Sequence, residues 1–210
     1  MRILSHRGFW GDTHDKNSQG AFSCSLDSGC GLETDIRDMK GDLVISHDSP
    51  ESGVESIKSL LDLVSEKKDP GLFTLALNIK ADGLALKLKD KLGKYPKLDY
   101  FVFDMSVPDM RSYMDAEIPF YTRVSEVEAP IWYEAAQGIW LDGFESDWYD
   151  AKIIERYILD KKEVCVVSPE LHGRDHKNVW AMLKIFSGNS NFLLCTDFPE
   201  LAYEFFYRDE

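Results

Sequence analysis

The sequence lacks long apolar runs, and no stretch reaches the roughly 18 consecutive apolar residues of a membrane-spanning helix. Its first residues run from Met1 straight into a polar segment, without the apolar region of a signal peptide. Four cysteines occur without Cys-x-x-Cys spacing: Cys24, Cys30, Cys165 and Cys195. In a chain without an export signal they are expected to be reduced and mostly buried. These absences predict a cytoplasmic protein.

Basic residues are also scarce, because 24 Lys and Arg face 37 Asp and Glu and give a formal net charge of −13. This balance disfavours nucleic acids and anionic membranes as partners, since both are bound by clustered positive charge. A phosphate ester can still be bound locally, through a metal ion or a few well-placed cations. The 210 residues and 44% hydrophobic content are ordinary for a globular protein with one domain, residues 1–210.

Eight short runs rich in β-branched and aromatic residues alternate with helical segments. The expected strands are 3–6, 31–39, 72–80, 100–106, 119–125, 138–145, 164–170 and 192–197. The expected helices are 18–28, 56–67, 83–95, 108–114, 129–136, 150–161, 178–186 and 199–207. The alternation predicts a parallel sheet of the α/β class, and eight repeats favour a (β/α)8 TIM barrel over an open doubly wound sheet. Residues 42–47 are expected to add a hairpin after the second strand.

Polar residues stand at the carboxyl ends of the expected strands, where a barrel carries its catalytic groups. They are His6, Glu33, Asp35, Asn78, Lys80, Asp104, Arg123, Asp142, Glu145, Glu170, His172 and Asp197. Charged side chains are costly to bury without partners, so a ring of them predicts a site at this rim.

Glu33 and Asp35 lie two residues apart on one strand and therefore project from the same face. Two carboxylates in one concave end repel each other unless a cation lies between them, and their oxygens suit Mg²⁺ or Ca²⁺. The alternative is an ordinary rim pair, bound to Arg7 or Arg37.

His6-Arg7-Gly8 follows the first strand and supplies an acid/base group, a phosphate-binding guanidinium and a flexible backbone. His47-Asp48 ends the hairpin and supplies a second imidazole with a carboxylate to orient it. Each motif alone is compatible with a hydrogen-bonded turn.

Taken together, these motifs form an ordered pattern over about forty residues. It comprises His6-Arg7-Gly8, Asn17, Ala21-Phe22, Gly29, Glu33-x-Asp35, Asp42 and His47-Asp48. The pattern resembles the N-terminal signature of the glycerophosphodiester phosphodiesterase family, and Thr196-Asp197-x-Pro199 is similar to that family's last strand and turn. The resemblance implies a TIM barrel and a metal-dependent phosphodiesterase acting on a small-molecule or polymeric substrate.

The same resemblance implies roles for individual residues. His6 and His47 would be the catalytic acid/base pair, and Glu33 and Asp35 would be ligands of a divalent metal ion. Arg7 and Lys80 would neutralise the phosphate, while Asn17 would help to close the first loop. Trp10, in that loop, is a further candidate for substrate contact.

The sequence departs from the family pattern on the third strand, where Asn78 replaces a Glu that serves as the third metal ligand. An amide oxygen can bind Mg²⁺ or Ca²⁺ but carries no full charge, so Asp104 is a candidate replacement. The family's usual insertion after His47 is also missing, which implies a more open site.

Three other functions remain open. They are a catalytically impaired barrel that binds phosphodiesters or sugars, a phospholipase D-like cyclising enzyme, and a metal-dependent sugar or phosphosugar enzyme on the same fold. The aromatic residues at 205–207 predict a closing helix packed on the barrel or, alternatively, a contact between copies of the chain.

Overall fold

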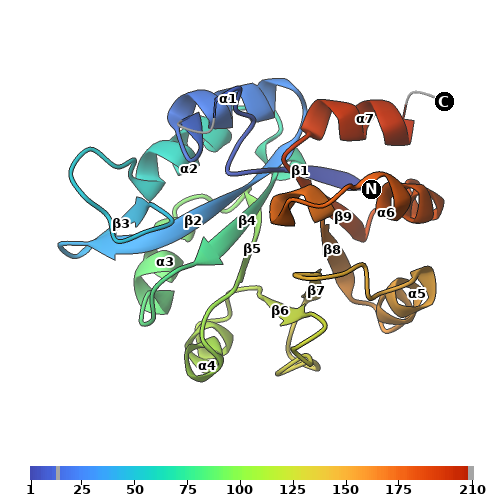
Figure 1. Ribbon diagram of the computed structural model, residues 1–210. Helices are drawn as coiled ribbons and strands as arrows, with labels where there is room; N and C mark the ends of the chain where they lie inside the picture. Colours follow the sequence, from blue (N-terminus) through green and yellow to red (C-terminus); the bar gives the residue numbers. More distant parts are fainter. Residues whose placement is uncertain (13–14, 208–210) are drawn as a thin grey trace.

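The computed structural model describes residues 1–12 and 15–207, and Figure 1 shows strands surrounded by helices. The eight parallel strands are β1 Arg2–His6, β2 Gly31–Met39, β4 Thr74–Ile79, β5 Asp99–Phe103, β6 Tyr121–Val124, β7 Gly138–Leu141, β8 Glu163–Val167 and β9 Phe192–Thr196. They are hydrogen-bonded in the order β5-β4-β2-β1-β9-β8-β7-β6. The short β3, Asp42–Ile45, pairs antiparallel with β2 and confirms the predicted hairpin.

The helices are α1 Gln19–Asp27, α2 Ile57–Ser65, α3 Ala85–Leu92, α4 Val107–Asp115, α5 Ala151–Leu159, α6 Lys177–Leu183 and α7 Pro199–Tyr207. Among the described residues, the named 3-10 turns are η2 Pro70–Leu72, η3 Pro169–His172 and η4 Lys184–Phe186. Several helices begin where a polar side chain accepts a hydrogen bond from a first-turn amide, which satisfies a backbone donor left free at the helix start. The capping residues are Ser18, Ser56, Ser106 and Asp150.

The sheet closes on itself, which confirms the barrel and rules out the open doubly wound alternative. The first and last strands pair along their length, with Ser5 opposite Thr196, and lie side by side in Figure 1. At the other junction the Val102 amide donates to the Pro119 carbonyl at 2.9 Å, and Val102 bridges in parallel to Phe120. This weaker seam joins β5 to β6.

The helix predicted over 129–136 is wrong, because β6 and β7 are connected by turns. Trp132 has a φ of 54°, in the left-handed region, which interrupts any right-handed helical run. The Ile131 amide donates instead to the Thr122 hydroxyl at 3.0 Å, and the amides of Ala135 and Ala136 both donate to the Trp132 carbonyl. The connection is therefore pinned to the barrel without a helix.

Apolar side chains fill the inside of the barrel and form a floor beneath the rim. Phe101 stacks on Tyr121 with 3.6 Å between ring centroids, and Phe103 stacks on Trp140 at 3.8 Å. On the outside, α7 packs its buried Phe206 against the strands, in agreement with the predicted closing helix. Within residues 1–12 and 15–207, no helix combines the length and apolar character needed to cross a membrane.

Candidate active site

Three oxygen-bearing side chains meet at the carboxyl ends of β2 and β4. Glu33 and Asp35 share the inner face of β2, and the strand register places Asp35 beside Asn78 of β4. All three are buried, with exposed fractions of 1%, 0% and 9%. The structure thus brings together the two carboxylates and the amide that the sequence suggested as metal ligands.

Asp35 is surrounded by three donors from two segments, the loop after β1 and the end of β4. Its Oδ2 lies 3.0 Å from Arg7 Nε and accepts a 2.8 Å hydrogen bond from Asn17 Nδ2. Lys80 Nζ lies 3.6 Å from Oδ1. Asn17 adopts a φ of 59° and accepts a hydrogen bond from the Thr34 hydroxyl, so its amide is held toward Asp35. The Asn17 side chain therefore fastens the loop after β1 to β2.

The pKa of Glu33 differs from that of an exposed carboxyl group. Its burial, and secondly the charge of Asp35, raise its pKa to about 7. The Arg7 backbone amide donates to Glu33 Oε2 at 3.2 Å, and His6 Nε2 lies 3.9 Å from the same oxygen. Near neutral pH, Glu33 is therefore poised between its protonated and ionised forms.

Two buried oxygen atoms at this site have no hydrogen-bond partner among the described residues, Asp35 Oδ1 and Asn78 Oδ1. Unpaired buried oxygens are costly, and a hard divalent cation binds such oxygens well. Within residues 1–12 and 15–207, no three His, Cys, Asp or Glu side chains form a metal-binding group. The third oxygen here belongs to an amide, so Glu33, Asp35 and Asn78 fit a hard cation with reduced ligand charge.

His6 is oriented by a carboxylate from the last strand. Its Nδ1 lies 2.6 Å from Asp197 Oδ1, a contact that follows from the pairing of Ser5 with Thr196 one residue earlier. Because a carboxylate only accepts, Nδ1 carries the proton and Nε2 is left to accept one. The Asp197 amide donates to Glu170 Oε1 at 3.2 Å, which fixes Asp197 in turn.

The Asp197 contact was not predicted as part of the site. The position of Asp197 at the end of the last strand could have predicted this contact, because a closed barrel places the last strand beside the first.

His47 reaches the same cleft from the loop after β3, but its support is looser. Its Nδ1 lies 3.0 Å from Asp48 Oδ1, as the sequence suggested. The His47 side chain is 47% exposed and that of Asp48 is 93% exposed, against 16% for His6. The structure therefore brings both predicted histidines to one cleft while anchoring only His6 deeply.

A cleft of about 290 Å³ opens between these groups at the barrel mouth. The predicted site residues that line it are His6, Arg7, Glu33, His47, Asn78, Lys80 and Asp104. Trp10 is not among the lining residues; its indole N–H donates to the His6 carbonyl at 3.0 Å and Lys16 covers its ring. Its position is suited to holding the His6 backbone rather than to touching substrate.

Asp104 lies in the cleft but is already neutralised by cations. One of its oxygens pairs with Arg123 and the other lies 3.3 Å from Lys80. Arg123 also binds Glu128 through its Nε at 2.5 Å. These ion pairs make Asp104 a poorer metal ligand than Asn78, whose oxygen is unpaired.

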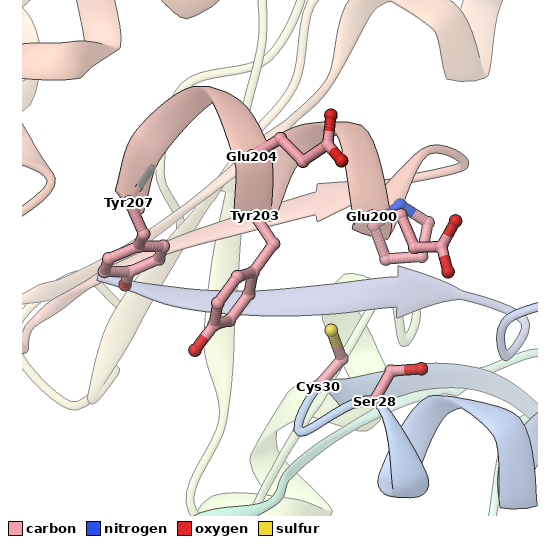
Figure 2. A pocket seen from close by; sticks show the side chains of 7 residues that line it. Ser28, Cys30, Glu200, Tyr203, Glu204 and Tyr207 are labelled. Carbon is pink, nitrogen blue, oxygen red and sulfur yellow. The ribbon is translucent and has the colours of Figure 1, made fainter. Parts of the chain in front are cut away.

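A second cavity, of about 430 Å³, lies on the outer surface between α7 and the turn before β2 (Figure 2). Its lining includes Cys30, Glu200 and Tyr203. Burial raises the pKa of the Cys30 thiol to about 11, so the sulfur is not a reactive thiolate at neutral pH. This cavity is lined by none of the residues at the carboxyl ends of the strands and has no histidine in its lining.

Solved structures with the same fold include phosphodiesterases. A glycerophosphodiester phosphodiesterase from Agrobacterium tumefaciens str. C58 is 17% identical, with a TM-score of 0.71 over 96% of this chain and 98% of that one. One from Parabacteroides distasonis ATCC 8503 is 13% identical, with a TM-score of 0.66 over 99% and 97%.

A Ca²⁺-dependent phosphatidylinositol-specific phospholipase C from Streptomyces antibioticus is 11% identical, with a TM-score of 0.57 over 98% of this chain and 95% of that one. No protein-family model and no protein with a curated description matches the chain. At these identities the comparisons confirm the resemblance at the level of the fold, the (β/α)8 barrel.

Proposed function

We propose that this protein is a phosphodiesterase that hydrolyses a glycerophosphodiester-like substrate with the help of a divalent metal ion. The observation that carries the proposal is His6, anchored by Asp197, which lines one cleft with Glu33 and Asn78. The buried Asp35 lies beside Asn78. An oriented imidazole next to buried, partly unpaired oxygens is suited to acid/base chemistry on a charged substrate. The fold shared with solved phosphodiesterases is consistent with this function.

The phosphate is expected to lie between Arg7 and Lys80, the two cations that line the cleft beside Asp35. Both are less than one-quarter exposed, so water screens their charge only in part. Charge on the non-bridging oxygens would thus be stabilised throughout the reaction.

Glu33, Asp35 and Asn78 would hold the metal ion. When bound, a divalent ion neutralises charge on a phosphate oxygen and aligns the substrate. Asn78 supplies its oxygen without a negative charge, so we expect weaker metal binding than a third carboxylate would give.

His6 would take a proton from the attacking hydroxyl through Nε2, since Nδ1 is held by Asp197. The imidazolium that forms would be stabilised by the Asp197 carboxylate. His47, which lines the same cleft from the loop after β3, would donate a proton to the leaving alcohol. Water as the attacking group gives hydrolysis, whereas a hydroxyl of the substrate itself would give a cyclic phosphate first.

The test is to incubate the metal-stripped protein with bis(4-nitrophenyl) phosphate and with glycerophosphocholine, alone and with Mg²⁺ or Ca²⁺. We expect metal-dependent release of a phosphomonoester, lost in Glu33→Ala and retained in Glu155→Ala, a control at an exposed position of α5. A cyclic phosphate would identify the cyclising route. No cleavage with either metal would contradict the proposal.

The uncharged Asn78 oxygen favours one second candidate, a barrel that binds phosphodiesters without cleaving them. In that case calorimetry would detect glycerophosphocholine binding in the absence of any turnover. Removing Lys80 would then weaken the binding.

A further inference from the structure

The wall of the cleft opposite Glu33 and Asp35 carries a third imidazole, His172, which the proposed reaction does not use. His172 ends the 3-10 turn after β8, and its Nε2 lies 2.7 Å from Oδ1 of Asp142, at the end of β7. The Asp142 side chain is 8% exposed, and its Oδ1 also accepts a 2.8 Å hydrogen bond from the Gly143 amide. A buried carboxylate thus holds this ring as Asp197 holds that of His6.

The surroundings of His172 fix its orientation further. Phe144 packs edge-on against the imidazole, with 5.2 Å between ring centroids. Gly173 follows with a φ of 73°, which turns the chain sharply after the histidine. Arg174 donates to the Gly143 carbonyl, so the two loops that carry Asp142 and His172 are bound to each other. These contacts therefore hold the His172 imidazole in one orientation.

The hydrogen bond to Asp142 decides what His172 can recognise. A carboxylate accepts only, so Nε2 carries the proton and Nδ1 of the neutral ring is an acceptor. None of the described residues hydrogen bonds to Nδ1, and the side chain is 25% exposed at the cleft. An acceptor at this position can bind a hydrogen-bond donor of the ligand. The ionised phosphate group of a diester carries no donor, so the donor must belong to the esterified alcohol.

The charges around His172 place the phosphate elsewhere in the cleft. Asp142 is an anionic neighbour of His172, and the charge of Arg123, which also lines the cleft, is taken up by Asp104 and Glu128. Arg7 and Lys80 lie at the β1–β4 side. A diester seated on those cations would extend one of its alcohol groups toward the ends of β7 and β8.

We propose that His172, positioned by Asp142, is a specificity-determining residue that accepts a hydrogen bond from a free hydroxyl of the esterified alcohol. The preferred substrate is then a phosphodiester of a polyhydroxy alcohol rather than of a simple alkyl alcohol. This inference rests on the proposed phosphodiesterase function. It assigns the β7–β8 wall to recognition of the alcohol, next to the phosphate-binding wall.

The experiment compares two symmetric diesters, bis(2,3-dihydroxypropyl) phosphate and bis(2,3-dimethoxypropyl) phosphate, which differ in hydroxyl donors. Symmetric diesters offer the same alcohol to either side of the phosphate. We expect the wild-type protein with metal to favour the hydroxylated diester by tenfold or more in kcat/KM, about the effect of one hydrogen bond in a partly buried site. Monoester release is followed by phosphorus NMR.

His172→Leu is expected to reduce this preference at least tenfold, whereas His172→Gln, which keeps an acceptor oxygen, should retain part of it. His176→Gln is the matched control, because His176 packs against Trp180 outside the cleft. The preference ratio cancels any general loss of folded enzyme.

Equal wild-type rates on the two diesters, or an unchanged preference in His172→Leu, would overturn the inference while leaving the phosphodiesterase intact. Failure of the wild-type protein to cleave either of these diesters, bis(4-nitrophenyl) phosphate or glycerophosphocholine would instead overturn the proposed function and the inference with it.

Discussion

The two sides of the barrel mouth are built on different principles. At the ends of β1, β2 and β4, several candidate site residues are neighbours in sequence, with His6 next to Arg7 and Glu33 two residues from Asp35, although His6 meets Asp197 only in the fold. At the ends of β7 and β8, Asp142 and His172 are thirty residues apart and meet only in the fold. The first side is suited to the phosphate and the second to the group attached to it.

The sides also differ in how the buried side-chain oxygens at the strand ends are hydrogen bonded. On the β6–β8 side, Arg123 is matched by Asp104 and Glu128, and His172 is matched by Asp142. On the β2–β4 side, buried oxygens of Asp35 and Asn78 remain without hydrogen bonds among the described residues. Unsatisfied buried groups are rare in folded proteins, and two oxygens of this kind on adjacent strand ends indicate where a cation would complete the structure.

The largest effect that would separate the two sides is expected from His6→Ala. Loss of the anchored acid/base group should lower kcat for phosphodiester cleavage about 10³-fold, within the range typical of a single proton-transfer group. The measurement is steady-state turnover of bis(4-nitrophenyl) phosphate with saturating metal. His176→Ala, outside the cleft, should stay within a few-fold of wild type. A His6→Ala enzyme that is equally active would refute the paired-histidine mechanism.

A second effect concerns the stability of the metal-free protein, where Glu33 is the sensitive group. Its pKa is about 7 in the folded state against 4.5 ordinarily, so between these pH values the folded protein retains a proton that the unfolded chain has lost. The stabilisation from this proton is complete below about pH 4.5 and is lost as pH rises through 7. Glu33→Gln removes the contribution of this group to the pH dependence of the free energy of unfolding, because glutamine does not titrate.

The Glu33→Gln protein should therefore gain stability relative to wild type as pH rises from 5 to 8, by up to about 3 kcal/mol. Denaturant unfolding in the presence of a chelator measures it, with Glu155→Gln as the exposed control. A constant difference across this pH range would mean that Glu33 does not carry the raised pKa.

The third prediction compares the two histidines of the proposed pair. His47→Ala should lower kcat by about 10- to 100-fold, less than His6→Ala, because His47 is nearly half exposed and is held only by the exposed Asp48. The same turnover assay measures it, and Asp48→Asn should cost only a few-fold. If His47→Ala were the more damaging change, the deeper anchoring of His6 would not reflect the larger catalytic role.

The sequence was most informative where chemistry depends on local spacing. The i, i+2 alternation of Glu33 and Asp35 predicted a shared face, and eight repeats predicted the closed barrel; both agree with the structure. The helix predicted over 129–136 failed because a left-handed Trp132 is a conformational choice that composition does not reveal.

Long-range partners were harder to predict than faces. The contacts of Asp197 with His6 and of Asp142 with His172 depend on strand order and barrel closure, which only the fold supplies. Trp10 illustrates the converse, since this loop aromatic donates a hydrogen bond to the His6 carbonyl and is not among the residues that line the cleft.

The smallest effect sharpens the comparison at the level of one atom, Asn78 Oδ1. Asn78→Asp is nearly isosteric and adds the charge that the amide lacks, so the affinity for Mg²⁺ or Ca²⁺ should rise about tenfold, to be measured by calorimetry. Asp104→Asn should change it by less than threefold, since Arg123 and Lys80 already engage Asp104. If Asp104→Asn instead weakened metal binding strongly and Asn78→Asp left it unchanged, the third metal ligand would be Asp104, after β5. Asn78 would then be a buried structural amide. Tighter metal binding by Asn78→Asp would instead show that the barrel mouth is a metal site whose ligands carry one negative charge fewer than strong binding requires.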